Sequence, residues 1–193
     1  VIGMTTKAED KIDHLLAAST HDNILFFTNK GKVYQLKVWD LPEGTRISKG
    51  QAIVNLINIE QGETITSVLT YPNLVNHRNG RAGANFIFMV TKKGTGKKTK
   101  LGEYANIRRS GLLAIKLEAG DELCWTKLTS GKSDVILITH DGKAIKFSEA
   151  QVRPTKRDTI GVRGIRLSKD DFVIGMDVVQ DPKAQLIVVM GKG

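Results

Sequence analysis

The sequence repeats itself, and this internal repeat constrains the fold more than any other feature of the chain. An aliphatic run, a hydroxyl residue, two further residues and a glycine next to basic residues recur around Gly31, Gly94 and Gly142. The three glycines are separated by 63 and then 48 residues. A fourth copy of the pattern begins within 186–193, where the chain stops. A period of this length is typical of solenoids and propellers, in which each unit buries its apolar face only against its neighbours.

Two further features recur in each unit. A large apolar residue stands ten positions after each glycine, and these residues, which we interpret as one structural position, are Leu41, Tyr104 and Val152. An apolar residue then enters an acidic turn, within the segments 58–63, 116–121 and 166–171. The units are therefore related along their whole length and not only at the glycine.

Each unit consists mostly of short runs rich in Val, Ile, Leu, Phe and Thr, bounded by Gly, Asn, Asp or Lys, which is typical of strands and tight turns. Asn29-Lys30-Gly31 and Asp141-Gly142 predict hairpin turns, because glycine adopts the positive φ that a short connection needs. About four strands per unit predict an all-β fold of radially arranged four-stranded blades. We expect a single domain over residues 1–193 with about four blades of about 50 residues each.

One segment is ambiguous. Residues 9–18 combine helix-forming residues with helical spacing, which favours a helix by propensity alone. Their place just before a repeat favours a strand instead.

Composition excludes several classes of protein. The chain is 40% hydrophobic and 25% charged, and no stretch reaches the roughly 18 apolar residues of a spanning helix, so neither a disordered tail nor a membrane protein is expected. The single cysteine, Cys124, excludes an internal disulfide and fits a reducing cytoplasm. A net charge of +9 suggests a polyanionic partner.

The basic residues concentrate in equivalent windows of the three repeats. Windows 28–51, 92–109 and 143–166 hold 5, 7 and 7 basic residues against 2, 1 and 2 acidic ones. The rest of the chain holds 10 basic and 15 acidic residues. If rotation about an axis relates the units, the windows form a positive band around the rim, and we expect the acidic turns to face away from it.

A positive band repeated at blade spacing suits a continuous phosphate backbone, because each neutralised phosphate releases counterions. The sequence contains no zinc-finger, basic-zipper or recognition-helix pattern, which favours contacts to the DNA backbone with bending over base readout. Aromatic residues do not interleave with the basic clusters, which argues against a platform for single strands. We therefore predict sequence-independent binding and bending of duplex DNA. The alternative is that these are solvated turn residues. The predicted DNA contacts are Lys30, Lys32, Arg46, Lys49, Lys92, Lys93, Lys97, Lys98, Lys100, Arg108, Arg109, Lys143, Lys146, Arg153, Lys156, Arg157, Arg163 and Arg166.

No catalytic or metal site is predicted. The histidines lack metal-ligand spacing, and the segment 94–99 lacks the glycine that a phosphate-binding loop needs five residues before its Gly-Lys pair. We interpret Cys124 as a small core residue. The acidic pairs at 121–122 and 170–171 recur at the same place in the repeat, so a role in a turn explains them without a metal. An enzyme active in its own right would need a convergent polar cluster that the sequence does not show.

Four segments carry a family resemblance: 13–22, 31–34, 49–56 and 159–167. The most specific are Ile53-Val54-Asn55-Leu56 and Gly161-Val162-Arg163-Gly164-Ile165-Arg166-Leu167. In these the chain resembles the C-terminal domain of the bacterial DNA gyrase A subunit. The resemblance implies a β-pinwheel, usually of six blades, whose neighbouring blades exchange strands, and it implies a strand at 9–18. It also implies a basic rim that wraps duplex DNA in a positive sense.

By the same resemblance the chain belongs to a type II topoisomerase that introduces negative supercoils. The expected partners are duplex DNA, the rest of the gyrase A subunit, and the gyrase B subunit of the holoenzyme. The expected location is the bacterial cytoplasm at the nucleoid, with no membrane. ATP and Mg, with the catalytic residues, belong to the holoenzyme, so this segment is expected to need no cofactor.

Two departures from the family pattern stand out. The family's glycine- and arginine-rich box is absent, and the chain starts without Met and stops within a repeat, so we expect an excised piece of a larger protein. The alternatives are the C-terminal domain of a topoisomerase IV subunit, or a propeller that binds proteins through its blade faces.

Overall fold

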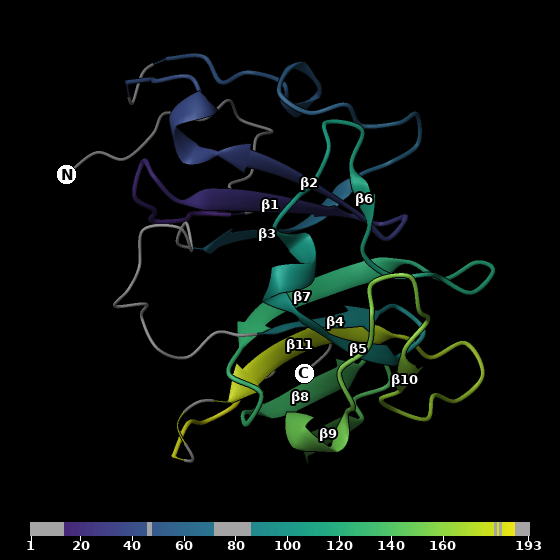
Figure 1. Ribbon diagram of the computed structural model, residues 1–193. Coiled ribbons are helices and arrows are strands. Elements are labelled where there is room, and N and C mark those ends of the chain that lie inside the picture. The colour runs from purple at the N-terminus through teal and green to yellow at the C-terminus, as the bar shows by residue number, and fades with distance from the viewer. Residues whose placement is uncertain (1–13, 46–47, 72–85, 180, 182, 188–193) are drawn as a thin grey trace.

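The computed structural model describes residues 14–45, 48–71, 86–179, 181 and 183–187. These residues form three antiparallel sheets that follow one another in space in the order of the chain (Figure 1). The helical segments among them are short 3-10 turns, namely η1 (Val38–Asp40), η2 (Ile53–Asn55), η3 (Leu101–Tyr104) and η4 (Glu149–Gln151). The predicted all-β fold is confirmed, with three blades in the described residues where we expected about four.

Each sheet is one blade. Blade 1 contains β1 (Asn23–Thr28), β2 (Lys32–Lys37), β3 (Ile65–Tyr71) and β6 (Leu112–Leu113), in the order β3-β1-β2-β6. Blade 2 contains β4 (Phe86–Thr91), β5 (Thr95–Lys100), β7 (Leu123–Thr129) and β10 (Val162–Arg163), in the order β10-β5-β4-β7. Blade 3 contains β8 (Asp134–Thr139), β9 (Ala144–Ser148) and β11 (Val173–Val179), in the order β11-β8-β9.

The blades exchange strands as the family resemblance implied. The second unit of the chain contributes β6 to blade 1, where Leu112 pairs with Val33 of β2. The third unit contributes β10 to blade 2, where Val162 pairs with Gly96 of β5. Since β3 contacts β7 and β7 contacts β11, these strands form the inner ends of the blades, and the exchanged strands lie at the outer ends.

The repeat pattern now has a physical explanation in the hairpin turns. Gly31 adopts a φ of 75°, Gly94 one of 82° and Gly142 one of 79°, as a left-handed turn position requires. The hydroxyl of the preceding Thr accepts the backbone N–H that follows the turn, as Thr28 does from Lys32 at 3.3 Å. The same bond forms in the other two units. Both predicted hairpins are confirmed.

The core lies between the blades, because β1 of blade 1 and β4 of blade 2 are covered on both faces and β8 of blade 3 is covered on one. Leu25 and Phe27 of β1 pack with Ile87 and Met89 of β4, and all four are fully buried. Phe88 and Val90, on the other face of β4, pack against blade 3. The residues predicted to share one position do so: Tyr104 and Val152 are buried in these two clusters, and Leu41 packs on a third cluster around blade 1.

The two ends of the chain differ from expectation. Residues 14–18 of the ambiguous segment are irregular and exposed, so neither the helix nor the strand continues through them, and 9–13 lie outside the described residues. Leu186 and Ile187 of the expected fourth unit are also irregular, and 188–193 lie outside the described residues. Nothing in the described part of the chain is a helix long and apolar enough to cross a membrane.

Candidate nucleic-acid interface

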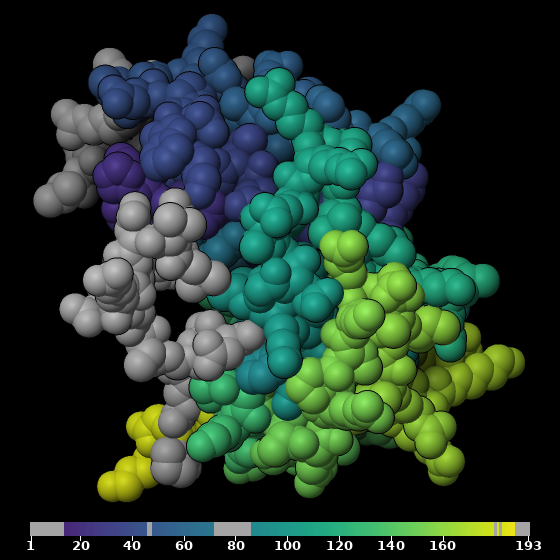
Figure 2. Space-filling model, in the orientation of Figure 1, coloured from purple at the N-terminus to yellow at the C-terminus, as the bar shows by residue number. Residues whose placement is uncertain are grey.

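Two segments carry the chain along the outer edge from one blade back to the preceding one. The first crossover, residues 105–111, joins η3 to β6, and the second, residues 153–161, joins η4 to β10. The second is fixed to blade 2 where the Thr155 N–H donates to the Lys98 carbonyl at 2.9 Å, and the Thr159 carbonyl accepts from the N–H of Lys116 at 3.1 Å. In Figure 2 this yellow-green segment lies over the teal surface of the second unit.

The crossovers present basic side chains outward. Arg108 and Arg109 are exposed on the first, and Arg153 and Lys156 are exposed on the second, where Arg157 is half-buried. Within the described residues, none of these five forms an ion pair with a carboxylate. We call the seven basic residues of this outer edge the crossover surface: Lys100, Arg108, Arg109, Arg153, Lys156, Arg157 and Arg163.

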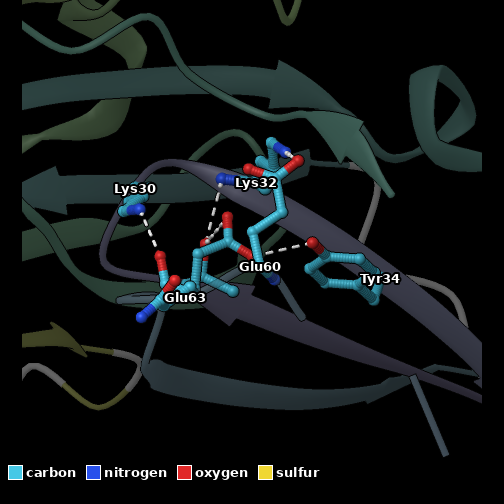
Figure 3. A network of polar contacts seen from close by, with 7 residues as sticks. Lys30, Lys32, Tyr34, Glu60 and Glu63 are labelled. Carbon is cyan, nitrogen blue, oxygen red and sulfur yellow. Dashed lines mark hydrogen bonds and ion pairs between the residues drawn. The ribbon is translucent and has the colours of Figure 1, made fainter. Parts of the chain in front are cut away.

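The hairpin-turn lysines have a different environment, because the acidic turns lie beside them. Lys30 donates to the Gln61 carbonyl at 2.9 Å, and Lys32 pairs with Glu60 at 2.5 Å, as Figure 3 shows. The hydrogen bond from Lys32 lowers the pKa of Glu60. The expectation that the acidic turns face away from the basic turns is therefore wrong for blade 1.

The same arrangement recurs in the other two blades. Lys93 donates to the Ala119 carbonyl at 2.8 Å, and Lys92 lies 3.7 Å from Glu122. Lys143 lies 3.8 Å from Asp171. The turn lysines thus satisfy the adjacent acidic turn of their own blade, which reduces the positive charge that they offer to an outside anion.

A buried carboxylate underlies each acidic turn. Glu63 accepts from the Tyr34 hydroxyl at 2.7 Å and from the Glu60 N–H at 3.0 Å (Figure 3). Asp121 accepts the Lys93 N–H at 2.9 Å, and Asp171 accepts the N–H groups of the corresponding turn in blade 3. These contacts give the recurring acidic pattern a structural role.

Lys97 and Lys98, two of the predicted DNA contacts, point into the protein. Lys97 is 1% exposed and its ammonium donates to the carbonyls of Ala114, at 2.9 Å, and Arg157. Lys98 is 3% exposed and donates to the Glu149 carbonyl at 2.6 Å. The prediction that these two lysines line the rim is wrong. The second crossover covers β5, so their stems pack inside while each ammonium reaches a backbone carbonyl.

The buried ammonium of Lys97 has altered chemistry. Burial lowers the pKa of Lys97 to about 8, because desolvation disfavours the charged form, although Asp158 acts in the opposite direction. Lys97 occupies the β5 position that corresponds to the buried Tyr34 of β2, counted from the turn glycine. This correspondence with a buried aromatic residue is the sequence signal that could have identified Lys97 as buried.

The remaining predicted contacts are dispersed. Lys49 and Arg166 are exposed and belong to neither crossover segment, while Lys146 pairs with Asp134 at 3.4 Å. Arg46 lies outside the described residues.

Sequence reasoning missed one group near the outer edge. Lys37 lies over the ring of Trp39, with its ammonium 5.5 Å from the ring centroid, and Trp39 is 51% exposed. Lys37 also lines an open hollow of about 680 Å³ with Asn106 and Arg109, between β2 and the first crossover. The view that aromatic residues stand apart from the basic clusters is therefore wrong at Trp39, which lies two positions after a lysine of the first window.

The histidines and the cysteine, as candidate ligands or nucleophiles, lie in the following surroundings. No group of three or more His, Cys, Asp or Glu residues in those ranges could hold a metal ion. His140 stacks on Phe172 with ring centroids 4.9 Å apart, and His21 packs edge-on against Trp39. Burial raises the pKa of the Cys124 thiol to about 11, which opposes thiolate reactivity.

Comparison with known proteins identifies the relatives of this chain. The family model described as "DNA gyrase C-terminal domain, beta-propeller" matches residues 22–72, 85–124 and 133–180. The DNA gyrase A subunit of Escherichia coli (strain K12) is 46% identical over 172 residues, or 89% of this chain and 19% of that protein. The DNA gyrase A subunit of Clostridium acetobutylicum is 44% identical over 161 residues, or 83% of this chain and 19% of that protein. The chain thus spans about a fifth of the length of these relatives.

Two solved structures share the fold. The C-terminal domain of DNA topoisomerase IV matches with a TM-score of 0.78 and 30% identity, over 92% of this chain and 53% of that one. The DNA gyrase A C-terminal domain matches with a TM-score of 0.66 and 24% identity, over 84% of this chain and 50% of that one. The second likeness, at this identity, concerns the fold alone.

Proposed function

Because the chain belongs to the DNA gyrase C-terminal domain family, we propose that it binds duplex DNA along the crossover surface and bends it around the outer edge of the blades. The observation that carries this proposal is the pair of consecutive crossovers, each with two exposed basic side chains that form no ion pair with a carboxylate within the described residues. Backbone phosphates suit such residues, because arginine binds their oxygens in a bidentate manner.

We further propose that the chain serves as this part of the DNA gyrase A subunit. In that role it supports ATP-dependent negative supercoiling together with the gyrase B subunit, in the cytoplasm at the chromosomal DNA, and it acts alongside the other domains of its own protein. The strand-passing chemistry, ATP and Mg belong to the holoenzyme. The absence of base-reading elements in the sequence supports binding that is largely independent of DNA sequence.

A second candidate is the corresponding part of a topoisomerase IV subunit, which the TM-score of 0.78 favours. The identities of 44% and 46% to the gyrase relatives favour the first. A holoenzyme assay separates them: gyrase whose own C-terminal domain has been replaced by this chain should still introduce negative supercoils into relaxed plasmid. Relaxation without supercoiling would favour the topoisomerase IV assignment.

Salt-dependent binding tests the crossover surface directly. A crossover variant replaces Arg108, Arg109, Arg153 and Lys156 with Ala, and a turn variant replaces Lys30, Lys93 and Lys143 with Ala. Each phosphate contact contributes about 0.9 to the slope of log K against log salt concentration, so the crossover variant should lose a slope of about 3 to 4. The turn variant should change little, because its lysines already donate to their own acidic turns. Greater loss in the turn variant than in the crossover variant would contradict the proposal.

A further inference from the structure

A tryptophan is exposed beside the outer edge of blade 1. Trp39 lies in the middle of η1, directly after β2, and is 51% exposed. Its position is nevertheless fixed. Its backbone N–H donates to the Thr20 carbonyl at 3.1 Å, the His21 ring packs edge-on against the indole with centroids 5.6 Å apart, and the Lys37 ammonium lies 5.5 Å from the indole centroid. A ring that is held in place while exposed loses little side-chain entropy when it makes a contact.

The exposure of this position is a property of the repeat. Counted from the turn glycines, Trp39 corresponds to Gly102 of η3 and Ala150 of η4, and all three residues are exposed. Blade 2 has a neighbouring blade on each side, and there a Cβ on Gly102 would still meet nothing within 4 Å. Neighbouring blades therefore leave this position open, and glycine or alanine is sufficient for the fold where blade 1 has an indole.

Trp39 adjoins the crossover surface. Lys37 and Asp40, which stand on either side of it in the chain, line the open hollow of about 680 Å³ that Asn106 and Arg109 of the first crossover also line. Lys37 and Arg109 form no ion pair with a carboxylate within the described ranges, so both can bind phosphates. Asp40 disfavours a phosphate directly beside the indole, because like charges repel. These surroundings favour contact of the indole with an uncharged part of the DNA.

We propose that Trp39 inserts its indole into a base step of bound duplex DNA and kinks the duplex there, while Lys37 and Arg109 hold nearby phosphates. This inference rests on the proposed function, because it adds a base contact to the DNA path along the crossover surface. Apolar side chains that enter a base step unstack it partly and bend the duplex. Pyrimidine–purine steps such as TA unstack most easily, so Trp39 gives a preference for these steps to binding that is otherwise independent of sequence.

Fluorescence tests the base contact, because the chain has two tryptophans. Trp125→Phe removes the other one, a half-buried residue of β7 that packs against the core between blades 2 and 3, and leaves Trp39 as the sole tryptophan. Binding is followed in parallel by the anisotropy of an end-labelled duplex. Stacking on bases quenches indole emission, so the emission should fall as the duplex binds, and further with a central TA step than with an A-tract.

Two results of this titration are contrary to the inference. Complete binding of the duplex with unchanged tryptophan emission overturns the base contact and leaves the proposed function intact. Absence of duplex binding overturns both.

Affinity provides a second readout. Trp39→Ala gives η1 the residue that η4 carries at this position, and Ile174→Ala, at a 47% exposed apolar residue of the inner strand β11, is the matched control. Circular dichroism and thermal unfolding establish that each variant folds. Trp39→Ala should weaken duplex binding about fivefold or more at a fixed salt concentration, because a stacking contact is lost. Trp39→Phe should retain most of the affinity, and Ile174→Ala all of it.

The salt dependence separates the indole from the charges beside it. Trp39→Ala should leave the slope of log K against log salt concentration unchanged, since no phosphate contact is removed. Lys37→Ala should reduce the magnitude of that slope by about 0.9. Wild-type affinity in Trp39→Ala, or a loss of slope equal to that of Lys37→Ala, overturns the inference.

Discussion

At the scale of single residues, the burial of Lys97 predicts a pH dependence of stability. The folded chain releases this proton near pH 8, whereas the unfolded chain keeps it up to the ordinary pKa of 10.5. Between these values the unfolded chain binds more protons, so the free energy of unfolding rises with pH. The gain between pH 8 and pH 9 should be about 1 kcal/mol in urea titrations. Lys97→Met should flatten this rise, and an equal rise in the variant would contradict the assignment.

The rise in the free energy of unfolding should reverse at higher pH, because two other groups titrate there. Burial raises the pKa of Cys124 to about 11 and that of Tyr71 to about 12, so above the ordinary values of 9.0 and 10.0 the folded chain holds more protons than the unfolded one. Stability therefore falls as these groups titrate in the unfolded chain. Because the unfolded Cys124 thiol already titrates partly below pH 9, the difference between wild type and Lys97→Met in this window isolates Lys97.

Glu149 provides a second residue-scale prediction. Its buried carboxylate accepts from the Thr129 hydroxyl at 2.6 Å and from the N–H groups of Gly131 at 2.9 Å and Ser133 at 2.8 Å. Glu149→Ala leaves these donors without their partner and should lower the free energy of unfolding by about 2–5 kcal/mol. Glu118→Ala, at an exposed position, should change it by less than about 0.5 kcal/mol. Similar effects at both positions would contradict the buried network.

At the scale of elements, strand exchange makes the turn glycines unequal. All three repeat glycines have positive φ, so Gly94→Ala and Gly142→Ala share the cost of a left-handed alanine. Only at Gly94 would the added Cβ also lie 2.7 Å from the Ile165 side chain of the next unit. Gly94→Ala should therefore lower the melting temperature more than Gly142→Ala. Equal losses in differential scanning calorimetry would show that the exchanged segment does not press on this glycine.

The elements also show which parts of the fold could be predicted from the sequence and which could not. The hairpins could be predicted because glycine and threonine requirements are local, and the resemblance supplied the strand exchange. The two-residue strands β6 and β10 are too short to carry a periodic pattern, and the second crossover that buries Lys97 and Lys98 is distant in sequence. The acidic turns were misplaced for the same reason, since Glu60 meets Lys32 only after β3 folds back along β1.

At the scale of the whole molecule, the proposed path for DNA follows the two crossovers. Successive crossovers carry their basic side chains along the outer edge, and in the proposed path a duplex that follows both bends around the blades. Bending a short duplex costs free energy that contacts along its whole path have to offset. The crossover variant should therefore lose bending more completely than it loses binding, which fluorescence energy transfer across an end-labelled duplex can measure. Unchanged bending at saturating variant would contradict this path.

The most direct test of this DNA path is topological. The chain is bound to nicked circular DNA, the nick is ligated, the protein is removed and the linking number is measured. We expect a linking number higher than in circles ligated without protein, rising with protein bound, and little shift with the crossover variant. An unchanged or lowered linking number at saturating wild-type protein would contradict a positive wrap along the crossover surface.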